Sequence, residues 1–188
     1  MKKVFFAFVS LLFCLNTQAQ CHFTNCVPTI VFAVLNTQCK ITIPNFTNTA
    51  LTGGCTTPVV VTQSPLANTQ FPAINGQLFT VTLTATDANG ATATCTRTIR
   101  ADDKTKPPIH TCPPSQTVIL DANGMLIVPD KTGQLVSTDG CSNPVTKTQN
   151  PIAGSLISCL PGGQIITIFT VTDGAGNTRT CTAILTGQ

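Results

Sequence analysis

Cysteine is the residue type with the most chemistry to offer in this sequence. The chain of 188 residues contains ten cysteines, and nine of them follow residue 20. Cysteines in such numbers form disulfides in an exported chain, whereas in a cytosolic chain they favour metal binding or catalysis. The nine are Cys21, Cys26, Cys39, Cys55, Cys95, Cys112, Cys141, Cys159 and Cys181. The chemistry to expect therefore depends on where the chain is located.

The spacing of these cysteines shows that the chain contains two copies of one unit. Intervals of 29 and then 40 residues separate Cys26, Cys55 and Cys95, and again Cys112, Cys141 and Cys181. The same offset of 86 residues places "TDANGATATC" (86–95) over "TDGAGNTRTC" (172–181). A period of this length is too long for a solenoid repeat and suits a domain that folds by itself. We therefore expect two tandem domains, 20–101 and 102–188.

The first residues have the pattern of a cleaved signal peptide. Two lysines precede an apolar run at Val4–Leu15, and small residues follow at Thr17–Ala19. The run is too short to span a membrane as a helix, and no later segment is long enough. A lipoprotein anchored through Cys21 is disfavoured because Gln20 precedes it, where such signals carry a small residue. We predict a signal peptide at 1–19, a secreted or cell-surface protein, and disulfide-bonded cysteines.

Charge and aromatic content exclude several classes of partner. Without the signal peptide, eight Lys and Arg residues face seven Asp and no Glu, which leaves a net charge of +1. A chain with so little charge has no electrostatic footprint for nucleic acid or for an anionic membrane. Six Phe remain after residue 20, with no Trp and no Tyr. The cores of both domains must therefore be small.

Alternation of apolar and polar residues predicts β-strands in both copies. "FTVTLTAT" (79–86) alternates with a period of two, "DANG" supplies a turn, and "ATATCTRTI" (91–99) resumes the alternation. The second copy repeats the pattern with "IITIFTVT" (165–172) and "TRTCTAILT" (178–186). No helical period stands out after the signal peptide. We predict an all-β protein in which disulfides, typically worth about 2–4 kcal/mol each, support two small cores.

Catalytic combinations are missing from the sequence. The histidines are His22 and His110, which are not equivalent in the two copies, and no nucleophile motif lies near either. There is no Glu for a carboxylate pair and no glycine-rich phosphate loop. His110 and Cys112 could supply half of a metal site, but a linker histidine beside a disulfide is the favoured interpretation. We therefore predict that the chain is not an enzyme and assign it no catalytic residue, no metal ligand and no cofactor.

A charged connector, "RADDKTKPP" (100–108), joins the two copies, and its paired prolines favour an extended link between domains that lie end to end. Asp102 and Asp103 could contribute to a calcium site there, but calcium needs six to eight oxygens, and Lys104 and Lys106 oppose the two carboxylates. Solvated linker charge is the favoured interpretation. A sugar site built from Asn, Thr and Phe is a second alternative, without the Trp or Tyr on which sugars usually stack.

The motifs resemble those of the hyalin-repeat, or HYR, domain. The opening motif of that family, an acidic-Thr-Pro stretch followed by Cys-Pro, is matched by "DDKTKPPIHTCP" (102–113). Its central motif is matched by "TDGCSNP" (138–144) and less well by "TGGCTTP" (52–58). Its closing hairpin motif, Thr-Asp-x-x-Gly-Asn-Thr-x-x-Cys, is matched in full by residues 172–181, whereas the first copy has Ala91 in place of Asn. The resemblance implies an immunoglobulin-like β-sandwich in an extracellular protein of adhesion or protein interaction, without catalysis.

One family cysteine is treated differently by the two copies. It is matched by Cys39 in the first copy, whereas Met125 holds that place in the second. Cys159 appears instead, at the place where the first copy has Ala73. Each copy therefore draws its fourth cysteine from a different position.

Several disulfide pairings are compatible with this pattern, since four cysteines allow three connectivities in each domain. The opening and closing strands of a sandwich commonly lie side by side, which favours Cys26–Cys95 and Cys112–Cys181. The remaining cysteines would then form Cys39–Cys55 and Cys141–Cys159, with Cys21 as the odd thiol. The function we expect is an exported, non-enzymatic module for adhesion, protein interaction or spacing, with an extracellular protein or a surface glycan as its partner. The alternative is a secreted carbohydrate-binding or calcium-linked accessory protein.

Overall fold

A computed structural model describes residues 20–27, 29–50 and 52–188 of the chain. The predicted signal peptide, 1–19, lies outside the described residues. These residues form sixteen β-strands and two short 3₁₀ turns, η1 (Thr47–Thr49) and η2 (Thr132–Gln134). The predicted all-β class, with disulfides, is confirmed. No helix in this part of the chain is long and apolar enough to cross a membrane.

The N-terminal half, residues 20–102, is built on a four-stranded sheet of order β2-β8-β7-β5, in which β2 runs parallel to β8. Two small antiparallel pairs, β1-β4 and β3-β6, accompany it. The strands are β1 (His22–Phe23), β2 (Ile30–Val34), β3 (Lys40–Thr42), β4 (Thr52–Gly53), β5 (Val60–Ser64), β6 (Gln70–Pro72), β7 (Leu78–Thr86) and β8 (Thr92–Asp102).

The C-terminal half, residues 103–188, repeats this plan with a sheet of order β10-β16-β15-β13, in which β10 runs parallel to β16. Its small pairs are β9-β12 and β11-β14. The strands are β9 (Ile109–Thr111), β10 (Gln116–Val118), β11 (Met125–Ile127), β12 (Val136–Ser137), β13 (Thr146–Asn150), β14 (Leu156–Ser158), β15 (Gln164–Thr172) and β16 (Thr178–Gly187).

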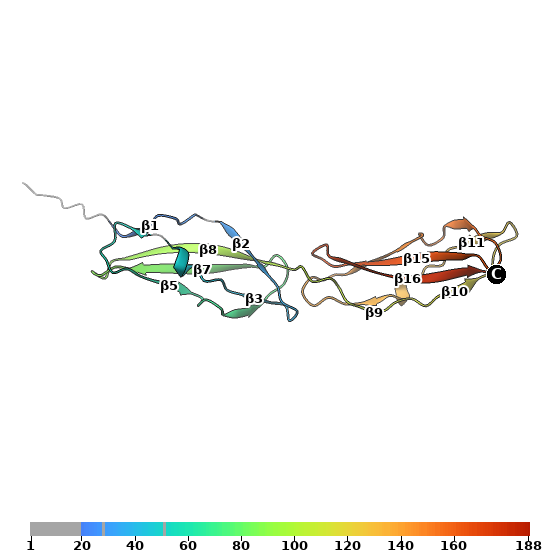
Figure 1. Cartoon of the computed structure of the whole chain (residues 1–188), viewed down its shortest axis with the longest axis horizontal. Coiled ribbons are helices and arrows are strands. Elements are labelled where there is room, and N and C mark those ends of the chain that lie inside the picture. The colour runs from blue at the N-terminus through green and yellow to red at the C-terminus, as the bar shows by residue number, and fades with distance from the viewer. Residues whose placement is uncertain (1–19, 28, 51) are drawn as a thin grey trace, which may run out of the picture.

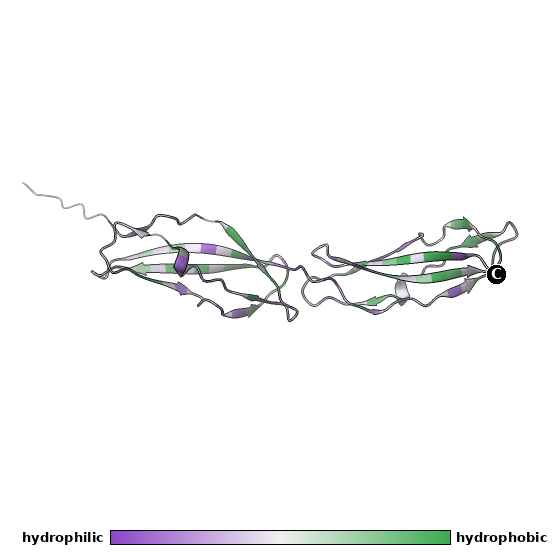
Figure 2. Cartoon of the chain, viewed as in Figure 1, coloured by the Kyte–Doolittle hydropathy of each residue, from purple (hydrophilic) through white to green (hydrophobic). Residues whose placement is uncertain are grey.

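The two halves lie end to end along the long axis of the molecule (Figure 1). Every strand pairing among the described residues stays within one half. The long hairpins β7–β8 and β15–β16 form the centre of each half, and their alternation places mainly apolar side chains on the inner face and mainly threonines on the outer one. Strand β15 departs from this pattern, because Thr167 is buried while Ile166 and Ile168 are exposed. Strands of both halves accordingly show hydrophobic and hydrophilic residues in alternation (Figure 2).

The cores are small and aliphatic. In the N-terminal half Ile41, Ile43, Val81 and Ile99 are fully buried, and in the C-terminal half Phe169 is the one fully buried aromatic among the described residues. Small cores of this kind leave a domain of about 85 residues close to marginal stability, so cross-links contribute a large share of the total.

Candidate functional site: the junction between the two halves

A tight turn at the end of the N-terminal half presents Cys39 to the C-terminal half. The side chain of Asn36 shapes the turn, since its Oδ1 accepts hydrogen bonds from the backbone N–H groups of Gln38 (2.9 Å) and Lys40 (3.0 Å). Cys39 has a positive φ of 56°, in the left-handed region that few non-glycine residues adopt. Its sulfur is bonded to Cys141, so a disulfide joins the two halves. Cys141 is 5% exposed and packs against the core of the N-terminal half.

Hydrogen bonds to the side chain of Asp139 fix the conformation of the loop that carries Cys141. The Oδ1 of Asp139 accepts hydrogen bonds from the backbone N–H groups of Cys141 (2.7 Å) and Ser142 (2.8 Å), in the manner of an Asx turn. The Gly174 N–H donates to the Ser142 carbonyl at 2.8 Å, which ties the loop to the β15–β16 turn. From the other half, the Asn75 N–H donates to the Cys141 carbonyl at 3.0 Å. The cysteine is therefore fixed from both sides of the junction.

Asp103 lies at the centre of the junction and is 1% exposed. Its carboxylate accepts hydrogen bonds from the Ser142 hydroxyl at 2.5 Å and from the Thr105 N–H at 2.9 Å. Its backbone N–H donates to the Asn75 side chain, and its carbonyl accepts from the Asn177 side chain, both at 3.0 Å. The expectation of solvated charge at this position was wrong, because the junction folds over the carboxylate and supplies its donors.

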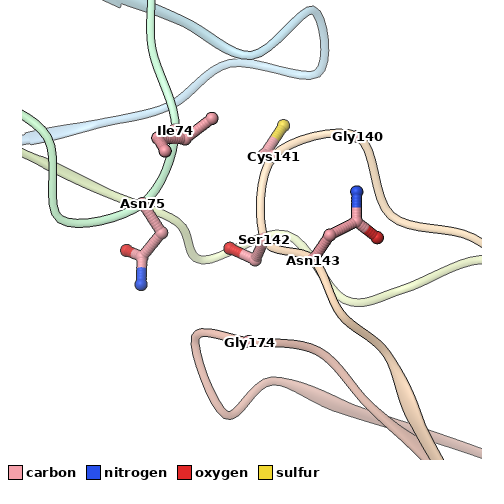
Figure 3. A pocket seen from close by; sticks show the side chains of 7 residues that line it. All are labelled: Ile74, Asn75, Gly140, Cys141, Ser142, Asn143 and Gly174. Atoms are coloured by element: carbon pink, nitrogen blue, oxygen red, sulfur yellow. The ribbon is translucent and has the colours of Figure 1, made fainter.

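A cleft of about 200 Å³ lies between the two halves at this point. Figure 3 shows that Ile74 and Asn75 face the loop Gly140–Asn143 across it, with the Ser142 side chain directed towards Asn75 and with Gly174 below. The lining contributes amide, hydroxyl and apolar groups, without a histidine, a carboxylate or a free thiol. Groups of this kind can hold two surfaces together by hydrogen bonds.

The described residues contain one group of side chains with the composition of a metal site, formed by Asp103, Asp139 and Cys141 within 4.8 Å of one another. The sulfur of Cys141 is bonded to Cys39 and is not a thiolate. Oxygens of both carboxylates accept hydrogen bonds from the protein. Asp102, the other residue considered for calcium, pairs with Lys104 at 2.9 Å. Two carboxylates engaged in this way fall well short of the six to eight oxygens of a calcium site.

Three further disulfides lie inside the halves, and two of them are equivalent. Cys26 is bonded to Cys95 and Cys112 to Cys181, the pairings expected from the opening and closing strands. Both have a sequence separation of 69 residues. They occupy equivalent places, and each closes the equivalent loop in its own half.

The other expected pairings, Cys39–Cys55 and Cys141–Cys159, were wrong. Cys39 lies near the start of β7, whereas Cys55 lies beside the turn that follows the end of β7. Nine residues of extended chain separate these ends by about 27 Å, far beyond the reach of a disulfide. β15 separates Cys141 from Cys159 in the same way. Local spacing cannot show at which end of a sandwich a cysteine lies.

The odd thiol was also assigned to the wrong residue. Cys21 is bonded to Cys55 and is 4% exposed, and among residues 20–188, as far as they are described, the free cysteine is Cys159, which is half-buried. In each half the loop cysteine, Cys55 or Cys141, therefore takes a partner from the chain that precedes it.

The counterpart of Cys39 in the C-terminal half is Gly124 and not Met125. Gly124 donates its N–H to the Asp121 carbonyl and has a φ of 71°, as Cys39 donates to Asn36 with a φ of 56°. One residue is missing between the cysteine of the opening strand and this turn, so the offset here is 85 and not 86. A glycine accepts the left-handed conformation without strain. The second turn therefore keeps the same backbone conformation, but it contains no cysteine that could form a disulfide.

Apart from Asp103, sequence reasoning did not find the polar residues of the junction. The available signal was a difference between the copies: Asp139, Ser142 and Asn177 stand where the first copy has Gly, Thr and Ala. In the C-terminal half, which follows another half, these three residues form hydrogen bonds at the junction. The two histidines lie apart from the junction. The ring of His22 is hydrogen-bonded to a backbone carbonyl, and the ring of His110 is hydrogen-bonded to the hydroxyl of Thr138.

Comparison with known proteins gives low similarity throughout. The chain matches no family model and no curated protein among those compared. Among solved structures it is similar to human mucin-like protocadherin EC1-2 (13% identity, 90% of this chain, 98% of that chain, TM-score 0.34). It is also similar to an E-to-A variant of titin domains I67–I69 (9% identity, 90% of this chain, 66% of that chain, TM-score 0.43). A third similar structure is Drosophila N-cadherin EC1-4 (12% identity, 90% of this chain, 50% of that chain, TM-score 0.32). The chain thus spans about two thirds of the titin fragment and half of the N-cadherin fragment.

Proposed function

We propose that this protein is an exported, non-enzymatic module of the hyalin-repeat kind, which holds or spaces partners outside the cell. The observation that carries the proposal is the disulfide between Cys39 and Cys141, which closes the joint between the two halves covalently. A chain with one such bridge and a buried hydrogen-bonded joint keeps its two ends at a fixed separation. This property suits a spacer or a rigid display of binding surfaces.

The remaining support comes from chemistry and from the sequence motifs. Four disulfides connect the described residues, and such cross-links persist in oxidising compartments outside the cytosol. The predicted signal peptide and the motif resemblance point to the same location. The partner we propose is an extracellular protein or a surface glycan.

Small-angle X-ray scattering of the oxidised mature chain tests the proposal. We expect a single extended shape with a narrow distribution of maximum dimension. In the variant Cys39→Ser/Cys141→Ser, the two halves should stay folded but sample many relative orientations, so the distribution should broaden. Cys159→Ser is the matched control, because it removes a thiol that forms no bridge.

Two outcomes would count against the proposal. A compact, folded-back shape of the parent chain would remove the basis for spacing. An unchanged distribution in the double variant would show that the bridge does not set the joint. Mass spectrometry of the exported protein tests location, with a mature chain that begins at Gln20 as the expected result.

A further inference from the structure

Strand β2, at the edge of the main sheet of the N-terminal half, exposes apolar side chains on its outer face. Ile30, Phe32 and Val34 are 53%, 59% and 59% exposed, while Val31 and Ala33 between them point inwards. Figure 2 shows β2 as a hydrophobic strand on the outside of this half. Exposed edge strands usually carry charge, which discourages association with other chains.

The exposed apolar surface of β2 continues across the sheet through Arg100 on β8 and Leu78 on β7. Phe32 lies opposite Arg100 on β8, and Arg100 lies opposite Leu78 on β7. Leu78 is 59% exposed, and the guanidinium of Arg100 lies 5.9 Å from the centre of the Phe32 ring, within cation–π range. We name Ile30, Phe32, Val34, Leu78 and Arg100 together the Phe32 face.

Arg100 has no carboxylate partner. The one ion pair among the described residues joins Lys104 to Asp102, and no hydrogen bond or ion pair of Arg100 is found in this part of the chain. Across the sheet Arg100 lies between Phe32 and Leu78, and along β8 it lies between Thr98 and Asp102, whose carboxylate pairs with Lys104. An exposed cation with apolar side chains on two sides is complementary to a carboxylate that is itself flanked by apolar groups.

The C-terminal half shows that the fold does not require these residues. Its register places Thr117, Thr186 and Gln164 in the row that Phe32, Arg100 and Leu78 occupy in the N-terminal half. This row of the main sheet is thus neutral and polar in the C-terminal half, whereas in the N-terminal half it is apolar and carries one positive charge. The C-terminal half does expose Ile166 and Ile184 on the outer face of its sheet, one pair further along, but this pair carries no charge. The combination of an exposed aromatic ring with an arginine in this row is found in the N-terminal half, and it points to a role there.

We infer that the Phe32 face binds a protein segment that presents one carboxylate between apolar side chains. Aromatic residues and arginine dominate the energetics of protein interfaces, and contiguous exposed apolar patches mark interaction sites. The carboxylate pairs with Arg100, and the apolar side chains cover Phe32 and its neighbours. The inference names the partner of the proposed module and so rests on that proposal, but binding is measured separately from the shape of the chain.

A peptide library displayed on phage, selected on the oxidised mature chain, provides the probe. We expect the selected peptides to share an acidic residue flanked by apolar residues. Binding of the synthetic consensus peptide should weaken about tenfold or more in Arg100→Glu and in Phe32→Ser. Thr186→Glu, the matched change in the C-terminal half, should leave the affinity unchanged.

A graft makes the test independent of any loss of folding. The variant Thr117→Phe/Gln164→Leu/Thr186→Arg rebuilds the row in the C-terminal half, and the stoichiometry of the consensus peptide should rise from one to two. Selection of basic or sequence-independent peptides, or an affinity that Arg100→Glu does not change, would overturn the inference. So would selective binding of neutral glycans to the same face. Each of these results leaves the scattering test of the spacer function unaffected.

Discussion

Cys55 and Cys141 occupy the same place in the two halves but are bonded to different kinds of partner. Cys55 is bonded to Cys21, at the start of the same half. Cys141 is bonded to Cys39, in the half that precedes its own. One repeated cysteine therefore closes a loop within its own half in one copy and links the two halves in the other.

The opening and closing cysteines show the contrasting behaviour. Cys26–Cys95 and Cys112–Cys181 link the same two positions in each half, with the same separation. Two classes of bridge thus coexist in the molecule, one internal to a half and one that connects it to its neighbour. The internal bridges stabilise each half, whereas the connecting bridge, Cys39–Cys141, fixes the position of one half relative to the other.

The largest expected effect comes from removing one of the two equivalent internal bridges. Cys112→Ala/Cys181→Ala should lower the free energy of unfolding of the C-terminal half by about 4 kcal/mol, because the open loop regains the entropy that the bridge removes. Cys26→Ala/Cys95→Ala should do the same to the N-terminal half. Hydrogen exchange read by peptide mass spectrometry in guanidinium follows each half separately. If either variant destabilised both halves equally, the halves would unfold as one unit.

A smaller effect is expected from one pair of equivalent core residues. Val81 on β7 is fully buried, and at its counterpart on β15 Thr167 is 1% exposed with a hydroxyl that finds no hydrogen-bond partner in the structure described. A buried polar group without a partner costs about 1–3 kcal/mol. Thr167→Val should therefore stabilise the C-terminal half by about 1 kcal/mol.

The reverse change is the control for that prediction. Val81→Thr should destabilise the N-terminal half by about 1–3 kcal/mol, measured by the same exchange experiment. If Thr167→Val lost stability, the hydroxyl would have to be bonded through an ordered water.

The sequence predicted features that depend on neighbouring residues. The alternation in 79–86 and 165–172 identified β7 and β15 almost to the residue, because the side chains of a half-buried strand must alternate between core and solvent. The repeat of the cysteine spacing identified both internal bridges, because opening and closing strands lie side by side in a sandwich. The first inference uses local geometry, and the second uses a strand adjacency that is common to sandwiches, although each bridge joins residues 69 apart in the sequence.

Features that depend on the two ends of the sandwich could not be predicted in this way. The partner of Cys39 is decided by the end of the sheet at which its turn lies, and the one-residue deletion before Gly124 obscured the equivalence of the two turns. The burial of Asp103 depends on the arrival of Ser142 from 39 residues further along the chain. Only the arrangement of the whole chain supplies this information.

The smallest effect we predict compares one aspartate in each half through its response to pH. The carboxylate of Asp87 has a lowered pKa, chiefly because the Thr56 N–H donates to it, with further donation from Ala91 and Asn89. That of Asp130 is lowered by the hydroxyl and then the N–H of Thr132.

A carboxylate whose pKa is lower in the folded chain than in the unfolded one stabilises the fold above the unfolded value of about 3.9, and this contribution is lost as the pH falls through the lowered value. Asp87→Asn should therefore flatten the acid limb of the stability profile of the N-terminal half alone. Asp130→Asn should flatten that of the C-terminal half alone. Urea titrations between pH 7 and pH 2, read by hydrogen exchange, measure both profiles. If the Asp87→Asn variant kept the slope of the parent below pH 4, the pKa of Asp87 would be the same in the folded and the unfolded chain, which would contradict the prediction. A slope that changed in the opposite half would show that the joint couples the two halves.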